Sequence, residues 1–400
     1  MRSFLRRPHA LPWALALAFA TMLLFAGSRD VFWTGDFYLE VYPAYEALIG
    51  GDVGGFFDKL PGYSGFVTVV GAPAALLTGA LGGVETMVYR LTAVPGLLAL
   101  AAVGVALAGP IRAAGNRVWP VFLAFGAGGA LAFETLRAGH PEDLLATGAA
   151  IGAVLAARGS RVGWASVLIV AAVVAKQWAV LAILPAALAA PRGGVRIAAS
   201  GVAGTVVLLA VQTQLGGAVH GTITNTGLLF HPHQLFWPFG LPATPEYIEA
   251  GHGTRMGPEW LMPLTRPMIV AAGVAVTAAW WLRSGPDRNR DDIFGVLALV
   301  FLLRCMLDPW DLVYYHLPLV VSLAAWEARR GRDLPALSVA VSAACWLTFV
   351  IYDARTGYGP FAAYLAWSVP LAAGLGLTLL RPAAQRRRAP ASRVAAPAPA

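Results

Sequence analysis

The chain has 400 residues, of which 58% are hydrophobic and only 12% are charged. Soluble globular domains carry roughly a quarter charged residues, so this composition excludes an ordinary soluble protein and indicates a multi-pass membrane protein. The formal net charge of +8 does not indicate a nucleic-acid partner, because the basic residues lie mainly in short loops and in the tail. In those places they set topology near anionic membrane lipids.

The first apolar run, Leu11 to Gly27, follows a basic cluster of Arg2, Arg6 and Arg7. Ala-Gly-Ser at 26–28 resembles the cleavage site of a signal peptide. The run is long, however, and further apolar runs follow it, so we expect a retained first helix. Residues 1–10 then form a basic cytoplasmic N-terminus.

Further apolar runs recur up to Leu380 and predict one multi-pass domain over residues 11–380. Basic clusters predict cytoplasmic loops, so the opposite face receives two outer loops, 28–63 and 214–262. The run 64–82 is rich in glycine and carries Pro73, and we expect it to lie in the interface or to re-enter.

These assignments predict an all-α polytopic membrane protein with about 12 transmembrane helices, within about 11 to 13. Both termini lie in the cytoplasm, and short interfacial helices occupy the first outer loop. The second outer loop is predicted to be an ordered lid, because Pro, Gly, His and aromatic residues dominate it without a helical period. The basic, Ala/Pro-rich tail over 381–400 is predicted to be disordered.

Asp36 begins a stretch in which Tyr38, Val41, Tyr45 and Leu48 recur at helical spacing. Its side chain can cap a short amphipathic helix on the membrane surface. A carboxylate held among aromatic residues at the interface can also act as a general base, because partial desolvation strengthens it as a proton acceptor. The residues alone leave both roles open.

The turn after the next apolar runs has the sequence Gly-His-Pro-Glu-Asp and places His140, Glu142 and Asp143 at a bilayer boundary. Packing requires neither two acids nor an imidazole there, so a functional role is expected. These side chains could bind sugar hydroxyls. They could also hold a divalent metal, although their spacing is not diagnostic of one.

Lys176 interrupts the otherwise uncharged run Trp164 to Ala190, which is too long for one straight crossing. We therefore expect a turn at Ala175 to Trp178 near the outer surface. A lysine that faces lipid is costly, so Lys176 is expected to line a polar cavity and to bind a phosphate group, or else to extend to the interface.

A second dense cluster begins at Arg304 and Asp308, which are four residues apart and can form an ion pair on a helix surface. His316 lies just inside the next apolar run, where a histidine usually faces a cavity. All three residues are candidates for substrate binding.

No cofactor is certain from the sequence. His231 and His233 make a poor chelate for a metal, and the two cysteines, Cys305 and Cys345, lie in apolar runs and are interpreted as small buried hydrophobic residues. A phosphate-binding glycine loop is absent from the sequence, which argues against ATP-driven chemistry. A nucleophile elbow is absent as well.

Together these features resemble the GT-C superfamily of membrane glycosyltransferases, in particular the polyprenyl-phosphate-mannose-dependent family 87 of actinobacteria. The resemblance runs from about Leu11 to Trp326. Its last element is similar to a Ser-Pro-x-Ser-Trp-x-His-His motif of the family, although only one histidine stands here. The similar segments are Gly35 to Tyr42 for the Asp-containing first outer loop, Gly139 to Leu144 in place of a Gly-Gln-x-Asn turn, Arg158 to Lys176 and Pro185 for a basic loop, helix and lysine unit, and Asp308 to Pro318.

The resemblance implies an inverting glycosyltransferase in the plasma membrane, with its active site on the outer face. Asp36 would deprotonate the acceptor hydroxyl, and Lys176, Arg304 or His316 would neutralise the departing phosphate. The implied partners are a polyprenyl-phosphate sugar donor, a lipid, glycan or protein acceptor of the cell envelope, and membrane lipids.

Three alternatives remain open at this point. A transporter or lipid flippase would use Lys176, Arg304 and the acidic turns as substrate or ion sites. A ligase or polymerase of lipid-linked glycans would also use basic outer loops but would not need Asp36. An assembly scaffold would need none of these residues.

Overall fold

The computed structural model describes residues 10–29, 35–61, 65–113, 129–214, 229–242, 253–285, 289–331, 335–351 and 358–381. The predicted cytoplasmic ends and parts of both predicted outer loops lie outside these ranges. The helices are α1 (Ala10–Gly27), α3 (Tyr42–Ile49), α4 (Val53–Asp58), α5 (Gly65–Ala80), α6 (Glu85–Ala113), α8 (Gly129–Arg137), α9 (Pro141–Arg158), α10 (Val162–Ala175), α11 (Ile183–Ala189), α12 (Gly194–Gln214), α14 (Met262–Ser284), α15 (Asp292–Leu307), α16 (Leu317–Arg329), α17 (Ala336–Trp346) and α18 (Tyr358–Leu379).

Apolar helices dominate the described part of the chain, which confirms the predicted class of a helical membrane protein. Within it, four helices are long and apolar enough to cross a membrane: α6, α12, α14 and α18. Shorter apolar helices include α5 and α10. The predicted number of about 12 crossings stays a prediction, because length and composition alone support these four.

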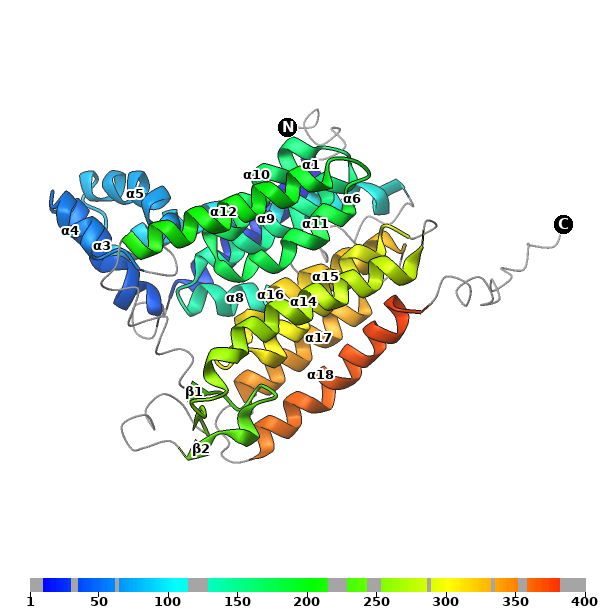
Figure 1. Ribbon diagram of the computed structural model, residues 1–400. Coiled ribbons are helices and arrows are strands. Elements are labelled where there is room, and N and C mark those ends of the chain that lie inside the picture. The colour runs from blue at the N-terminus through cyan, green and yellow to red at the C-terminus, as the bar shows by residue number, and fades with distance from the viewer. Residues whose placement is uncertain are drawn as a thin grey trace.

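The helices form two groups that lie against each other (Figure 1). One group contains α6 and α9 to α12, and the other contains α14 to α18. Contacts of α16 with α6 and α9, and of α11 with α15, join the groups. At the α9 C-terminus, Asp291 accepts from Arg158 at 2.5 Å and from Arg329 at 2.8 Å, which links both groups electrostatically.

The predicted turn at Lys176 is confirmed. The α10 helix ends at Ala175, and Lys176 has an extended backbone with φ −153° and ψ 129°. A 3₁₀ helix, Gln177–Ala182, follows, and α11 then continues from Ile183. The break ends the helical hydrogen bonding at the one charged residue of this run and leaves its side chain at a helix terminus.

The second predicted outer loop contains a small antiparallel sheet, which the all-α prediction did not include. Its strands are β1 (Leu229–Phe230), β2 (Leu241–Pro242) and β3 (Arg255–Met256), in the order β1-β3-β2. Arg255 stacks on the ring of Trp237, with its guanidinium carbon 3.9 Å from the ring centroid. These two-residue strands are too short for a sequence period to reveal.

The sheet and the first outer segment lie at the same end of the molecule. In Figure 1, α3, α4 and α5 lie at the end of the bundle that also carries β1 and β2. The His231 N–H donates to Pro309 O at 2.8 Å, and the Leu235 N–H donates to Met306 O at 2.8 Å. The segment around β1 is therefore docked on the C-terminal end of α15, next to the cluster that begins at Arg304.

Candidate functional site

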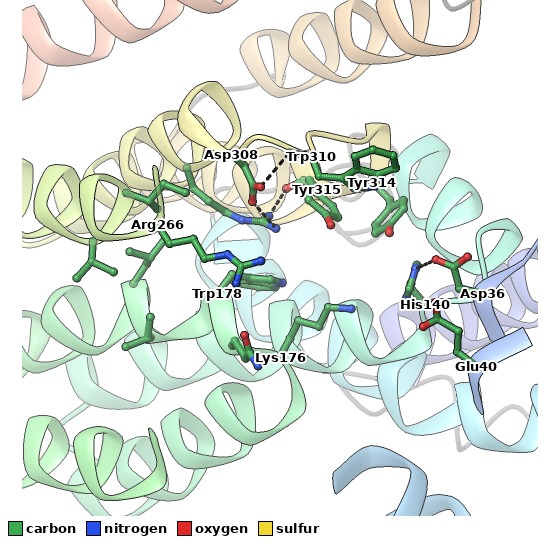
Figure 2. Close-up of a pocket in the computed structure, with 16 residues that line it drawn as sticks. Asp36, Glu40, His140, Lys176, Trp178, Arg266, Asp308, Trp310, Tyr314 and Tyr315 are labelled. Atoms are coloured by element: carbon green, nitrogen blue, oxygen red, sulfur yellow. Dashed lines mark hydrogen bonds and ion pairs between the residues drawn. The ribbon is translucent and has the colours of Figure 1, made fainter. Parts of the chain in front are cut away.

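A cavity of about 330 Å³ opens between the two helix groups at this end of the molecule (Figure 2). Charged and aromatic side chains from several elements line it. Figure 2 shows Asp36 and His140 at one end, Arg266 toward the other, and Lys176 between them. The lining residues used below are Asp36, Glu40, His140, Lys176, Trp178, Arg266, Arg304, Asp308, Trp310, Tyr314 and Tyr315.

Asp36 occupies the N-cap position of a single π-helical turn, Phe37–Val41, but its side chain makes no capping hydrogen bond. The capping interpretation is therefore wrong. Instead, Asp36 Oδ2 lies 2.8 Å from Nε2 of His140. The Asp36 side chain is 46% exposed, so an acceptor molecule can reach it.

The turn before His140 fixes this pairing. Gly139 has φ +85°, a conformation that glycine adopts without strain. A Cβ at Gly139 would stand 2.6 Å from the backbone nitrogen of Phe37, so only glycine permits this close approach. The Asp36 N–H also donates to Ala138 O at 3.1 Å. The first outer segment thus rests directly on the turn between α8 and α9.

His140 bridges two carboxylates. Its Nε2 pairs with Asp36, and its Nδ1 lies 2.8 Å from Oε1 of Glu142. Burial disfavours the charged imidazole and so does Lys176, but the two carboxylates outweigh both and raise the pKa of His140 to about 9. An imidazolium that donates both N–H groups therefore holds Asp36 in place at neutral pH.

Glu142 and Asp143 lie behind the cavity wall, where both side chains are buried. The ammonium of Lys176 lies 2.7 Å from Oε1 of Glu142 and 3.0 Å from Oδ2 of Asp143, and the Trp178 indole donates to Asp143 Oδ1 at 2.6 Å. These partners explain why the two acids are tolerated in a buried position. Glu142 and Asp143 position Lys176 and His140 rather than face the cavity.

Lys176 lines the cavity as predicted, but its charge is shared with the two acids. That Lys176 binds a phosphate group stays a prediction. His140, Glu142 and Asp143 also bring ligand atoms within 4.8 Å of one another, which would suit a metal. The ammonium of Lys176 already supplies the positive charge there, so the cluster needs no metal ion to balance its acids.

Two arginines supply further positive charge. Arg304 Nη1 donates to Tyr315 O at 3.1 Å, and Arg304 Nη2 lies 3.7 Å from Asp308 Oδ2. The predicted ion pair is thus present. Burial raises the pKa of Asp308 above its usual value, while Arg304 opposes this shift.

Arg266 of α14 also lines the cavity, but it was not identified from the sequence as a site residue. A charge four residues into an apolar helix was the signal that could have revealed it.

His316 differs from its predicted place. Its side chain is fully buried and does not line the cavity. It lies behind Tyr314 and Tyr315, where it contacts Asp311 and Tyr364. Of the eight predicted site residues, the cavity brings together Asp36, His140, Lys176, Arg304 and Asp308, whereas Glu142, Asp143 and His316 support it from behind.

The fold and site define a helical membrane protein with a charged cavity at one end of its bundle. No protein-family model, curated protein or solved structure matches the chain. The function must therefore be inferred from the chemistry of the cavity.

Proposed function

We propose that the protein is an inverting membrane glycosyltransferase that moves a sugar from a polyprenyl-phosphate donor to an acceptor hydroxyl. One observation carries the proposal. A partly exposed carboxylate, Asp36, and two arginines, Arg266 and Arg304, line the same cavity. A displacement at a sugar carbon needs a base for the incoming hydroxyl and positive charge for the outgoing phosphate.

The chemistry follows from this arrangement. The acceptor hydroxyl gives its proton to Asp36 as its oxygen forms a bond to the anomeric carbon, and the bond from that carbon to the lipid phosphate breaks. The electron pair leaves with the phosphate oxygen, whose charge Arg266 and Arg304 stabilise. Because the nucleophile and leaving group lie on opposite sides of the carbon, a single displacement inverts its configuration.

The size and composition of the cavity support a sugar-phosphate headgroup. Its volume of about 330 Å³ falls at the lower end of the range for small-molecule sites, about 300 to 1,000 Å³. Trp178, Tyr314 and Tyr315 form an aromatic part of the cavity wall, in which Arg304 packs on the ring of Tyr315 and His140 packs beside Tyr314. Glu40 adds a second carboxylate beside Asp36 (Figure 2), and it can accept hydrogen bonds from sugar hydroxyls.

The proposed topology places the cavity at the outer face of the plasma membrane. We infer about 12 crossings with both termini in the cytoplasm, on the charge pattern of the loops. The arrangement of the described parts supports this topology, because the first outer segment, the small sheet and the cavity all lie at one end. A donor with a membrane-anchored chain would reach the cavity from the lipid phase.

The test measures transfer of labelled sugar from a panel of polyprenyl-phosphate sugars in membranes that carry equal amounts of each variant. Asp36→Asn keeps the size of the side chain but removes the base, and we expect transfer to fall by about 10² to 10⁴-fold. Asp58→Asn is the matched control, because Asp58 is exposed and does not line the cavity.

Transfer that is unchanged in Asp36→Asn would overturn the proposed mechanism. If no donor supports transfer and the labelled lipid moves between leaflets, the protein is a flippase and not a glycosyltransferase. The two assays use the same membranes, so each alternative has a distinct result.

A further inference from the structure

A second cluster of chemically active side chains lies behind the cavity wall, outside the site described above. Cys305 of α15, Asp311 of the following loop and His316 bring one ligand atom each within 4.8 Å of one another. All three side chains are fully buried. Two of these residues bracket Tyr314 and Tyr315, which line the cavity.

Both oxygens of the buried Asp311 carboxyl lack a hydrogen bond of good geometry to the described residues. Its polar neighbours are His316, whose Nε2 lies 3.5 Å from Oδ2, the Tyr364 hydroxyl and the Cys305 thiol. A buried carboxylate without partners is costly, and such groups in folded proteins frequently mark a bound ion or water. The cluster contains no lysine comparable to the Lys176 that neutralises Glu142 and Asp143.

The imidazole of His316 is oriented as a ligand. Its Nδ1 lies 3.4 Å from the carbonyl oxygen of Leu312. A carbonyl only accepts, so Nδ1 carries the proton in the neutral ring, and the lone pair of Nε2 faces the Tyr364 hydroxyl at 3.2 Å and Asp311 Oδ2 at 3.5 Å. Metal-binding histidines are commonly held in this way by a backbone carbonyl.

The distances and charges suit a divalent ion. Bonds of about 2.0 to 2.2 Å at tetrahedral angles place a nitrogen and an oxygen ligand about 3.4 Å apart, close to the separation between His316 and Asp311. A thiolate and a carboxylate together carry two negative charges, which a divalent cation neutralises without a further counter-ion. The hydroxyl of Tyr364, which lies 3.2 Å from His316 Nε2, would supply a further oxygen donor beside these three residues.

The thiol can be deprotonated without leaving a buried acceptor unpaired. Cys305 Sγ donates to Tyr315 O at 3.4 Å, and the same oxygen accepts from Arg304 at 3.1 Å. On metal binding the sulfur loses its proton and the arginine remains on the carbonyl. Cys345, the only other cysteine of the chain, also lies within electrostatic range of Asp311.

We propose that Cys305, Asp311 and His316 form a structural site for a borderline transition metal such as Zn²⁺, which fixes the segment that carries Tyr314 and Tyr315 against α15. Mixed sulfur, nitrogen and oxygen donors select zinc over magnesium or calcium. The site is independent of the proposed transfer reaction, because none of its three ligands lines the cavity.

The first test is the metal content of the full chain, purified in detergent after zinc loading and gel filtration. We expect about one zinc ion per wild-type chain and a fall to background in Cys305→Ser and Asp311→Asn. Asp308→Asn is the matched control: it makes the same change three residues away, outside the cluster, and should keep its zinc.

A second measurement needs no variant. Cobalt(II) added to the wild-type chain should give the absorption of a tetrahedral site together with a sulfur-to-cobalt charge-transfer band. A folded, monodisperse wild-type chain that retains no zinc and shows no such band would overturn the proposal. So would a Cys305→Ser chain that keeps the full zinc content.

Discussion

His140 Nε2 lies 2.8 Å from Asp36 Oδ2, although 104 residues separate the two in the chain. This pair turns a carboxylate that could have capped its own helix into a group presented to a cavity. The pairing depends on a histidine that is charged, on a glycine that allows close approach, and on a lysine that balances the acids behind it. Each dependence leads to a test.

The charge of His140 predicts a pH-dependent stability. Its folded-state pKa of about 9 is higher than the 6.5 of an ordinary histidine. The stabilisation is thus complete below about pH 6.5 and is lost as the pH rises through 9, with a magnitude of about 3 kcal/mol. Thermal unfolding in detergent should show wild-type stability falling over this window. The His140→Gln variant should lack that fall, and equal pH profiles would contradict the assignment.

Gly139→Ala should disturb the site through the backbone of Phe37. The new Cβ would stand 2.6 Å from that nitrogen, and the φ of +85° adds strain. Gly285→Ala is the control, since it has φ +62° but no atom within 4 Å of the new Cβ. We expect sugar transfer to be lost in Gly139→Ala and kept in Gly285→Ala. Equal transfer in both would show that the close approach has no role in positioning Asp36.

Lys176→Met leaves two buried acids without their ammonium. Breaking a buried ion pair by removing one partner typically costs about 3 to 5 kcal/mol, so we expect a large drop in the denaturant midpoint. The double variant Lys176→Met with Glu142→Gln should recover part of the loss, because one uncompensated charge is removed. A double variant no more stable than Lys176→Met alone would argue against the ion pair as the source of the effect.

Substitution of Glu327, which does not line the cavity, should change the stability of the protein. Its carboxylate accepts the N–H groups of Leu337 and Ser338 at 2.9 Å each and the Ser338 hydroxyl at 2.7 Å, which satisfies the first turn of α17. Glu327→Ala should lower stability by about 2 kcal/mol, in the range of a lost helix cap. The exposed Glu85 provides the control, and Glu85→Ala should change stability little. The check is thermal unfolding of both variants.

The sequence was sufficient to predict a helical membrane protein and the positions of some helices along the chain. A composition with so few charges indicates apolar helices, and a single lysine in an apolar run indicated where α10 ends. The helical spacing of Tyr38, Val41 and Tyr45 predicted the helical turns that the first outer segment forms over Phe37–Val41 and Tyr42–Ile49. Short strands such as β1 and β3 have no period that a sequence could show, because each contains only two residues.

Five of the residues that line the cavity were predicted from the sequence, but Arg266 was missed and the pairings were not foreseen. Only 12% of the residues are charged, which is why Asp36, Lys176 and Arg304 stood out. Which acid pairs with which base depends on the packing of helices distant in sequence, so the partnership of His140 with Asp36 could not be predicted. The burial of His316 behind Tyr314 was missed for the same reason.

The ion pairs of the site also imply an order of assembly. Lys176 and Glu142 pair within the hairpin of α9 and α10 and are separated by 34 residues in the chain. Asp36 and His140 are separated by 104 residues. Closing short loops costs less entropy and precedes the pairing of distant segments. In a full-length chain that refolds, the hairpin can therefore pair its buried acids before the first outer segment docks at His140. A chain halted between these two steps would have neutralised its buried charges but would not yet hold Asp36 in the cavity, and under the proposed mechanism it would not transfer sugar.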